Sequence, residues 1–351
     1  MTPVDAAGDV LRRAIAERVF PAAAVEVGDA DRVLAQDVFG TLTFEPDSPA
    51  TTLETPFDLA SLTKVIATTT LVMKLVAAGR LTLDEPVSAF FQDWRAVDRE
   101  GVTVRDLLEH ASGLPARLID APPGTRREFE HEIGTIPLEY APRTASIYSD
   151  LGFILLGFAV ADRGGSPLAA QFDDWAGDLA GDLTYNLPVD RRRRAAPTRP
   201  MPEDPRRGRI LVGEVHDNYA AALGGAAGHA GLFGTAPAVG RFARLVLGAL
   251  RGNAGLTPPF SPALVATFAA RSRVAGSSRA LGWDTMLPTS SCGTHMSAAA
   301  IGHVGFTGTS LWIDPQRDRY FVLLTNRKGG GGTLDEMGDV RRAFHDALGA
   351  L

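Results

Sequence analysis

The segments that favour β-structure lie at the two ends of this chain, while the middle favours helices. Strand-forming runs bounded by turn residues occur over Ala23–Val27, Arg32–Phe39, Ala298–Val304, Thr309–Ile313 and Tyr320–Thr325. Between residues 86 and 205 the pattern is one of helical segments and long loops. The sequence therefore predicts an α+β fold, in which an antiparallel sheet built from both chain ends is flanked by helices and carries an inserted, mostly helical domain.

The predicted organisation is one catalytic unit over residues 1–351 with two parts. Residues 1–80 and 210–351 form an α/β subdomain, and residues 81–209 form the inserted subdomain. Within the insertion, residues 115–143 are expected to be an irregular loop, and residues 186–209 are rich in Pro and Arg. Helices are expected over residues 4–19, 61–76, 104–110, 151–160, 239–250 and 335–348. A ligand site is expected in the cleft between the two parts.

Composition and charge exclude several classes of function. Among 351 residues, 45% are hydrophobic and 22% are charged, which is typical of a globular protein. The net charge of -6 disfavours nucleic acid as a partner. The basic run Arg191–Arg194 lies between Pro188 and Pro197 and is interpreted as a solvated loop, with a nucleic-acid or lipid contact as the lesser alternative.

Cysteine, histidine and apolar patterns point away from metals and membranes. Cys292 is the only cysteine, and the seven histidines do not show metal-ligand spacing, so neither a disulfide nor a metal or other cofactor is expected. No apolar run is long enough to span a bilayer. Residues Met1–Asp5 lack the basic and apolar parts of a secretory signal, so a cytoplasmic protein without a membrane partner is expected unless an export signal has been removed. The oligomeric state is left open.

The first candidate for chemistry is Ser61-Leu62-Thr63-Lys64, at the start of an apolar helix. The three-residue spacing places the Ser61 hydroxyl and the Lys64 amine on one helix face, with Asp58 as the expected N-cap. A lysine kept neutral by burial can take the proton of a serine and make it a nucleophile. The alternative is an ordinary helix with a polar first turn.

Two further motifs are expected to meet Ser61 in the cleft. In Tyr148-Ser149-Asp150, the phenol can relay a proton if nearby cations lower its pKa, or the motif simply caps the apolar helix that follows. In His303-Val304-Gly305-Phe306, Gly305 allows close approach, and a backbone N–H at the strand edge can complete an oxyanion hole with the N–H of Ser61. His303 is then a partly charged donor, or a satisfied histidine at a strand end.

In order and spacing, these motifs resemble those of the serine β-lactamase-like superfamily, which includes class C β-lactamases, penicillin-binding proteins and family VIII esterases. The segments Val104–Leu114, Gly224–Thr235 and Gly305–Pro315 support the resemblance, which covers about residues 20–350. The stretches Val215–Asp217 and Gly228–Gly231 are similar to a subgroup of D-alanyl-D-alanine carboxypeptidase-like proteins linked to the cell wall. In that subgroup pattern, His229 either lines the cleft or holds a glycine-rich turn.

The resemblance implies roles for individual residues. Ser61 corresponds to the acylated nucleophile, Lys64 to its activating partner and Tyr148 to a second proton-transfer group. Phe306 corresponds to the residue that gives the second oxyanion N–H through its backbone, with Gly305 before it.

Two positions depart from the family pattern. Asp150 stands where the family often has Asn, and an ionised Asp only accepts hydrogen bonds. It favours a protonated Lys64 and opposes the use of Lys64 as a base, unless Tyr148 takes over. His303 stands where β-lactamases have Lys, and it is neutral for much of the time near pH 7. The residues expected to replace the lost carboxylate anchor or to contact substrate are Asn326, Arg327 and Lys328.

The predicted function is a serine hydrolase that acts through a Ser61 acyl-enzyme on a small ester or D-amino-acid amide. Both the carboxylesterase and the DD-carboxypeptidase type fit, with a β-lactam at most a slow substrate. The partner is then a small molecule or short peptide. The alternative is a receptor that binds muropeptides or β-lactams with little or no turnover. The substrate, and the base in each half-reaction, are left open.

Overall fold

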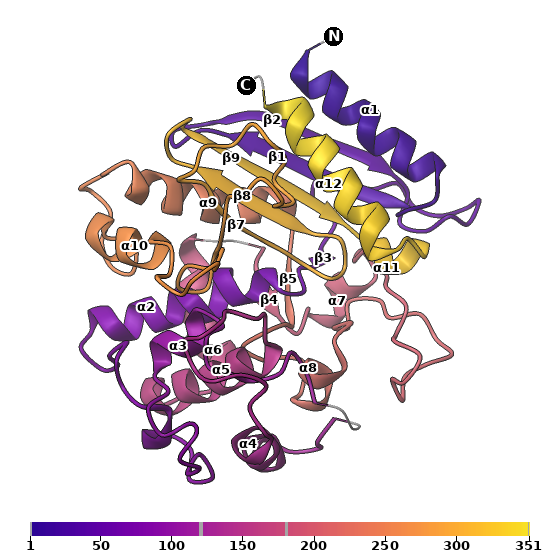
Figure 1. The fold of residues 1–351 in the computed structure, drawn as a ribbon. Coiled ribbons are helices and arrows are strands. Elements are labelled where there is room, and N and C mark those ends of the chain that lie inside the picture. Colours follow the sequence, from indigo (N-terminus) through magenta and orange to yellow (C-terminus); the bar gives the residue numbers. More distant parts are fainter. Residues whose placement is uncertain (1, 119–121, 180–181, 350) are drawn as a thin grey trace.

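A six-stranded antiparallel sheet built from both ends of the chain forms one half of the molecule (Figure 1). The computed structural model describes residues 2–118, 122–179, 182–349 and 351. The strand order is β2-β1-β9-β8-β7-β6. These strands are β1 (Ala22–Gly28), β2 (Val33–Gly40), β6 (Asp284–Thr285), β7 (Ile301–Val304), β8 (Ser310–Asp314) and β9 (Arg319–Thr325). Because β1 pairs directly with β9, the predicted sheet from both chain ends is confirmed.

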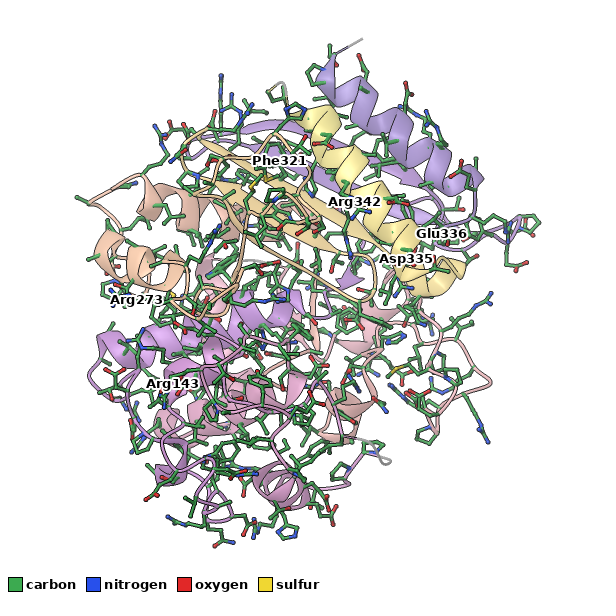
Figure 2. All side chains as sticks on the ribbon, in the orientation of Figure 1. Arg143, Arg273, Phe321, Asp335, Glu336 and Arg342 are labelled. Carbon is green, nitrogen blue, oxygen red and sulfur yellow. The ribbon has the colours of Figure 1, made fainter. Side chains whose placement is uncertain are left out.

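Helices cover both faces of this sheet. The terminal helices α1 (Pro3–Ala16) and α12 (Leu334–Leu348) pack together on one face, and α9 (Ala236–Leu250) contacts β1, β8 and β9 on the other (Figure 1). Figure 2 shows Phe321 of β9 under α12, where its ring meets His345 edge-on at a centroid distance of 6.0 Å. Asp335 and Glu336 lie in the first turn of α12, where the helix dipole favours negative charge (Figure 2).

The other half of the molecule is mainly helical. The remaining helices are α2 (Thr70–Ala77), α3 (Val104–Leu108), α4 (Arg126–Thr135), α5 (Asp150–Gly164), α6 (Leu168–Leu179), α7 (Val189–Arg192), α8 (Asn218–Ala222), α10 (Pro262–Ala269) and α11 (Arg327–Gly330). A π-helix over Lys64–Thr69 precedes α2, and a 3₁₀ turn spans Val87–Ala89. A small sheet of order β3-β5-β4 joins β3 (Phe57–Asp58), β5 (Leu232–Gly234) and β4 (Thr184–Tyr185). It places the segment before Ser61 beside the glycine-rich stretch before β5.

Several helices of this half were not expected from the sequence, and α7 includes the first two residues of the basic run Arg191–Arg194 that was interpreted as a loop. Helix α4 lies inside the expected loop over residues 115–143, of which 119–121 are outside the described residues. Its start is fixed by a capping box between Thr125 and Glu128, a signal that the Pro and Gly content of the stretch obscured. Helix α6 was missed as well. The subdomain boundaries at residues 80 and 209 stay a prediction. None of the described helices has the length and apolar character to cross a membrane.

Candidate active site

The segment that carries Ser61 is held in a strained turn. Ala60 has a φ of 47°, in the left-handed region that few residues other than glycine adopt. The Asp58 carboxylate accepts from the N–H of Ala60 at 2.8 Å and from the N–H of His216 at 2.6 Å. Asp58 therefore fixes the turn before Ser61, and it does not cap the helix as expected.

The Ser61 hydroxyl lies within hydrogen-bond distance of both proposed partners. Ser61 Oγ is 2.7 Å from Tyr148 Oη and 3.2 Å from Lys64 Nζ. Lys64 Nζ also donates to Tyr148 Oη at 2.7 Å. The structure therefore brings the first two motifs together as a closed triangle of three polar atoms, in which a proton can leave Ser61 without crossing open solvent.

The third member of the second motif, Asp150, starts helix α5. The Ser149 hydroxyl caps that helix by accepting from the N–H of Gly152, so the capping interpretation of the motif is confirmed. The cap also fixes Tyr148 and Asp150 on either side of it. Tyr148 Oη donates to Asp150 Oδ1 at 3.0 Å.

Lys64 is an ammonium in this arrangement. It donates to Asp150 Oδ1 at 2.8 Å and to the carbonyl of His229 at 3.1 Å, and neither acceptor can supply a hydrogen in return. Burial alone lowers the pKa of Lys64, but Asp150 and then Tyr148 outweigh burial, and the pKa is raised above its usual value. The condition for Lys64 to act as a base, that burial keeps it neutral, is therefore not met, and Asp150 has the effect on Lys64 that the sequence predicts.

Tyr148 is a neutral phenol. Burial, followed by the negative charge of Asp150, raises the pKa of Tyr148, and the opposing effect of Lys64 does not cancel the rise. The condition set for Tyr148 as a proton relay, that nearby cations lower its pKa, is therefore not met in the resting site. For Asp150, burial raises the pKa, but Lys64, His229 and Arg117 outweigh burial and hold the pKa below its usual value. The resting site thus contains an ammonium, a neutral phenol and a carboxylate.

His303 lies beside Tyr148 and is buried, with the two ring centroids 6.1 Å apart. Its Nδ1 is 2.9 Å from the carbonyl of Val304, which can only accept, so Nδ1 carries the hydrogen. Burial, followed by the charges of Lys64 and Arg279, lowers the pKa of His303 well below its usual value. His303 is therefore neutral, and its Nε2, which has no partner among the described residues, is an acceptor. His303 was expected to be a partly charged donor, and this expectation is corrected: the ring is neutral, and its free nitrogen accepts.

The turn after β7 is fastened to the nucleophile segment. A Cβ on Gly305 would lie 2.6 Å from the carbonyl oxygen of Leu59, so the close approach predicted for this glycine is present. The hydroxyls of Thr307 and Thr309 donate to the carbonyls of Asp58 and Leu59 at 2.7 and 3.0 Å. These bonds fix the position of Phe306 relative to Ser61.

The backbone N–H of Phe306 is oriented by its own peptide group. The carbonyl of Gly305 accepts from Arg341 at 2.7 Å, and a trans peptide directs its N–H to the opposite side. The N–H of Phe306 therefore points away from Arg341. Within the described residues, neither this N–H nor that of Ser61 has a hydrogen-bond partner. Two free donors are what an oxyanion hole requires, and this role stays a prediction.

Asn326 does not reach the site. Its Nδ2 donates to the carbonyls of Leu42 and Pro197 at 2.9 and 3.1 Å, and its Oδ1 accepts from the N–H of Ala22 at 3.1 Å. The residue is buried and ties β1 and β9 to two loops. The expected substrate contact is therefore corrected: the amide is used up by backbone groups.

Arg327 and Lys328 differ from each other. Arg327 is buried and donates to the carbonyls of Phe306 and Gly332, so it cannot replace the carboxylate anchor as expected. Lys328 Nζ lies 5.3 Å from the centroid of the Phe306 ring. Burial, and then the Arg327 charge, lowers the pKa of Lys328. Of the two, only Lys328 remains a candidate to bind a substrate carboxylate.

A cavity of ≈ 300 Å³ opens in front of Ser61. Tyr148, Asp150 and Phe306 line it, together with His229, whose Nε2 is 2.7 Å from Asp217 Oδ1. Four other polar residues line the cavity and had no role predicted from the sequence: Arg117, Glu203, His216 and Asp217. The Val215–Asp217 stretch of the subgroup pattern could have indicated His216 and Asp217 as site residues. No sequence motif surrounds Arg117 or Glu203.

Arg117 joins two of the carboxylates in this cavity. Its Nη1 is 2.9 Å from both Asp150 Oδ2 and Asp217 Oδ2, and its Nη2 donates to Asn218 at 2.6 Å. The ligand atoms of Asp150, Asp217 and His229 lie within 4.8 Å of one another, which is compatible with a metal ion. The guanidinium already supplies a cation to both carboxylates, so these residues form a balanced ionic network.

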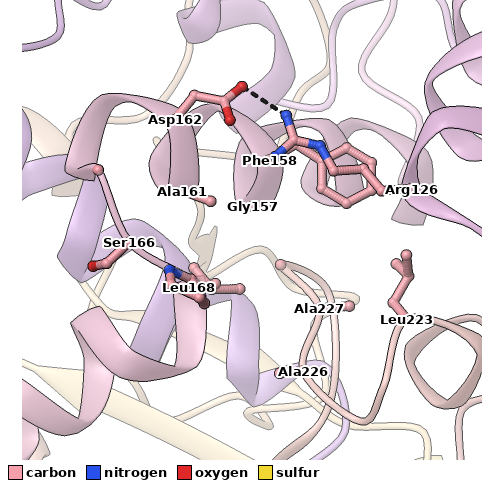
Figure 3. Close-up of a pocket in the computed structure, with 13 residues that line it drawn as sticks. Arg126, Gly157, Phe158, Ala161, Asp162, Ser166, Leu168, Leu223, Ala226 and Ala227 are labelled. Carbon is pink, nitrogen blue, oxygen red and sulfur yellow. Dashed lines mark hydrogen bonds and ion pairs between the residues drawn. The ribbon is translucent and has the colours of Figure 1, made fainter.

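A second pocket, of ≈ 540 Å³, is lined in part by Ala226 and Ala227 of the glycine-rich stretch (Figure 3). Its walls are mostly apolar, with Leu168 and Leu223 on two sides and the Arg126–Asp162 ion pair at 2.6 Å on a third (Figure 3). None of its lining residues is Lys, Tyr or His, and its one carboxylate, Asp162, is paired with Arg126, so its one serine, Ser166, lacks the partners that Ser61 has. The cavity at Ser61 is the candidate active site.

Comparisons with known proteins agree with this geometry. The family model described as Beta-lactamase matches residues 9–345. The chain belongs to the β-lactamase family. It is 32% identical over 305 residues to an N-acetylmuramyl-L-alanine amidase of Bacillus subtilis (strain 168), which covers 78% of this chain and 68% of that protein. It is 31% identical over 326 residues to a putative D-alanyl-D-alanine carboxypeptidase of Escherichia coli (strain K12), which covers 82% of this chain and 72% of that protein.

Solved structures support the same fold for this β-lactamase-family chain. It superposes on EstCE1, a hydrolase with promiscuous acyltransferase activity, with a TM-score of 0.77 and 21% identity over 99% of this chain and 98% of that chain. A class C β-lactamase from Rhodobacter sphaeroides gives a TM-score of 0.77 and 21% identity over 98% of each chain. The predicted β-lactamase-like α+β fold is confirmed, and the chain is a serine hydrolase by family.

Proposed function

We propose that this chain hydrolyses a small ester or D-amino-acid amide through an acyl-enzyme on Ser61. The triangle of Ser61, Tyr148 and Lys64 carries the proposal, because a serine hydroxyl is a weak nucleophile until a neighbour takes its proton. The N–H groups of Ser61 and Phe306 stabilise the oxyanion. Water then enters the cavity and releases the acyl group.

Within this substrate class, an amide next to alanine is favoured over a simple ester. Two relatives above 30% identity are named as an N-acetylmuramyl-L-alanine amidase and a putative D-alanyl-D-alanine carboxypeptidase, and both names refer to amides of alanine. The partner is then a short peptide or muropeptide rather than a macromolecule.

The loss of a carboxylate anchor supports a low rate with β-lactams. His303 is neutral where a β-lactamase has lysine, and Arg327 is bound to backbone carbonyls. The Arg117 guanidinium that lines the cavity is already bound to two carboxylates, which leaves Lys328, beside Phe306, as the candidate anchor for a β-lactam carboxylate. We therefore expect slow acylation by β-lactams.

One observation favours an alternative. Because Lys64 is an ammonium and Tyr148 a neutral phenol, neither is a ready base, and a receptor that binds a muropeptide without turnover is the second candidate. It predicts binding without an acyl adduct.

The test compares wild type with Ser61→Ala by intact-mass spectrometry and by turnover. The probes are a p-nitrophenyl ester, a D-alanyl-D-alanine peptide, N-acetylmuramyl-L-alanine and a β-lactam. An adduct or product that requires Ser61 supports the hydrolase, and the two alanine probes separate the amide types. Binding of the muramyl probe with neither adduct nor product would replace the hydrolase by the receptor.

A further inference from the structure

The destination of the Ser61 proton is the open step of the proposed function. Lys64 is already protonated, because Asp150 and Tyr148 raise its pKa above the usual value, and it donates to the carboxylate of Asp150 and the carbonyl of His229. Tyr148 is protonated as well. The phenol can take a proton from Ser61 only if it gives up its own at the same time.

The hydrogen bonds supply an acceptor for that second proton. The single hydrogen of Tyr148 Oη is directed at Asp150 Oδ1, 3.0 Å away. We assign that hydrogen to Asp150, because the carboxylate can only accept whereas the Ser61 hydroxyl can also donate; in the 2.7 Å contact between Ser61 and Tyr148, Ser61 is then the donor. The order of donation therefore runs from Ser61 through Tyr148 to Asp150, with the carboxylate at its end.

We propose that Asp150 is the terminal base of acylation and receives the Ser61 proton by way of Tyr148. The inference rests on the proposed Ser61 acyl-enzyme and names the base of that same reaction. It also gives Asp150 a catalytic use that Asn cannot have, since a neutral amide does not take up a proton from a phenol. The departure from the family pattern at this position is then functional.

The atoms and charges of the step balance. As Ser61 Oγ bonds to the carbonyl carbon, the O–H bond of Ser61 breaks and its proton passes to Tyr148 Oη, while the original Tyr148 proton passes to Asp150 Oδ1. The π pair of the carbonyl becomes the oxyanion, so one negative charge moves from Asp150 to the substrate oxygen. When the C–N or C–O bond of the leaving group breaks, the leaving group takes a proton from Tyr148, and Asp150 returns its proton to Tyr148.

The charges around Asp150 suit a carboxylate that acts only transiently as a base. Lys64 and Tyr148 face its Oδ1, Arg117 binds its Oδ2, and a ligand atom each of Asp217 and His229 lies within 4.8 Å of its carboxylate. Lys64 keeps its proton throughout and stabilises the negative charge that develops on Ser61 and Tyr148. In this scheme Lys64 is an electrostatic group and not the base.

The first test is the acylation rate of Asp150→Asn with a p-nitrophenyl ester, measured under single-turnover conditions. Loss of a positioned general base is expected to lower this rate by about 10²–10⁴-fold. Circular dichroism and thermal melting show whether the variant folds. An acylation rate within about tenfold of wild type would overturn the relay, because Lys64 or Tyr148 would then suffice as the base.

The second test does not depend on that variant. The acid limb of kcat/KM reports the base of the free enzyme, and here it is expected below the usual carboxyl range of about 4. Arg117→Gln removes a cation bound to Asp150 at 2.9 Å, so the limb is expected to move to higher pH. Asp217→Asn is the matched control: it removes a carboxylate that binds Arg117 at the same distance but does not contact Tyr148, and the limb is expected to persist.

The outcomes separate the relay from the proposed function. Ser61-dependent acylation in wild type together with an acid limb that does not move in Arg117→Gln would overturn the relay alone. Absence of any Ser61-dependent adduct or turnover in wild type would overturn the proposed function, and the relay with it. A limb that moves upward in Arg117→Gln, with a slow Asp150→Asn, supports both.

Discussion

Two buried cations of this molecule respond to burial in opposite ways. Lys64, beside Ser61, bonds to a carboxylate, whereas Arg341, on α12, donates to the carbonyls of Gly305 and Thr309 at 2.7 and 2.9 Å. The pKa of Lys64 is raised because Asp150 and Tyr148 outweigh burial. Burial, followed by the charge of Arg327, lowers the pKa of Arg341 to about 9. The available counter-charge decides which direction prevails.

The difference extends to their surroundings. We call Lys64, Arg117, Asp150 and Asp217 the catalytic cluster, in which two cations meet two carboxylates. We call Arg327, Arg341 and His345 the basic cluster, and none of its members pairs with a carboxylate in the described part of the chain. The catalytic cluster is stabilised by its own charges. The basic cluster lowers the stability of the fold, because its charges are buried without a carboxylate. Arg327 and Arg341 nevertheless hold the turn at Phe306 through hydrogen bonds to its carbonyls.

The largest effect is expected for Lys64→Met. This change leaves Asp150 with one cation fewer in a buried site, and breaking such a pair costs about 3–5 kcal/mol of unfolding free energy. Acylation of Ser61 is expected to fall as well. Urea unfolding and single-turnover kinetics measure the two effects. Lys74→Met is the control, since its 3.5 Å pair with Asp174 is exposed and worth about 0–1 kcal/mol. Equal losses for the two variants would contradict the comparison.

Gly305→Ala tests the contact between the two clusters. A new Cβ would overlap the Thr309 hydroxyl and come within 2.6 Å of the Leu59 carbonyl, and overpacking of this kind costs about 1–3 kcal/mol. Displacement of Ser61 relative to Phe306 is expected to slow acylation by about 10²-fold. Kinetics and thermal unfolding check both. Gly177→Ala on α6, with open space around it, should leave acylation unchanged, and a Gly305→Ala rate equal to wild type would argue against a fixed oxyanion turn.

The sequence was sufficient for the elements and motifs whose signals are local. The strands at the two chain ends, the cap at Ser149 and the close approach at Gly305 follow from alternation, capping and backbone freedom. Helix α6 could have been found too, because Leu168, Phe172, Trp175 and Ala176 recur at helical spacing and are buried.

Protonation states could not be predicted in the same way. The effect of Asp150 on Lys64 was predicted, but Asp150 itself also binds Arg117, which comes from a loop with no motif. The place of Asn326 depends on two carbonyls, of Leu42 and Pro197, that are remote in the sequence. Such contacts are products of the tertiary fold, so a motif alone assigns residue types to a site but not their charges or partners.

Arg341→Met is expected to have a smaller effect than Lys64→Met. Two hydrogen bonds to carbonyls are lost, but an uncompensated buried charge is lost with them, so the net change in unfolding free energy is expected to be about 1 kcal/mol. Urea unfolding of the two variants side by side measures the difference. If Arg341→Met lowered the unfolding free energy as much as Lys64→Met, the presence of a carboxylate partner would not explain the difference between the two clusters.

The smallest effect concerns the pH dependence of stability and His345. Burial, followed by the charge of Arg341, lowers the pKa of His345 to about 3, so between about pH 6.5 and 3 the unfolded chain binds a proton that the folded chain does not. Its contribution is thus present above pH 6.5 and is lost as the pH falls toward 3.

His345→Gln removes this titration and can keep the 3.1 Å bond to Ser310. Its unfolding free energy at pH 7 is expected to change by less than about 1 kcal/mol, while its loss of stability between pH 7 and pH 4 is expected to be smaller than that of wild type. Denaturant unfolding across this range measures it. Asp58, whose pKa burial raises to about 6, contributes with the opposite sign in both proteins and cancels in the comparison. An unchanged acid slope would show that the acid sensitivity comes from outside the basic cluster, for example from His216, whose pKa burial lowers to about 4.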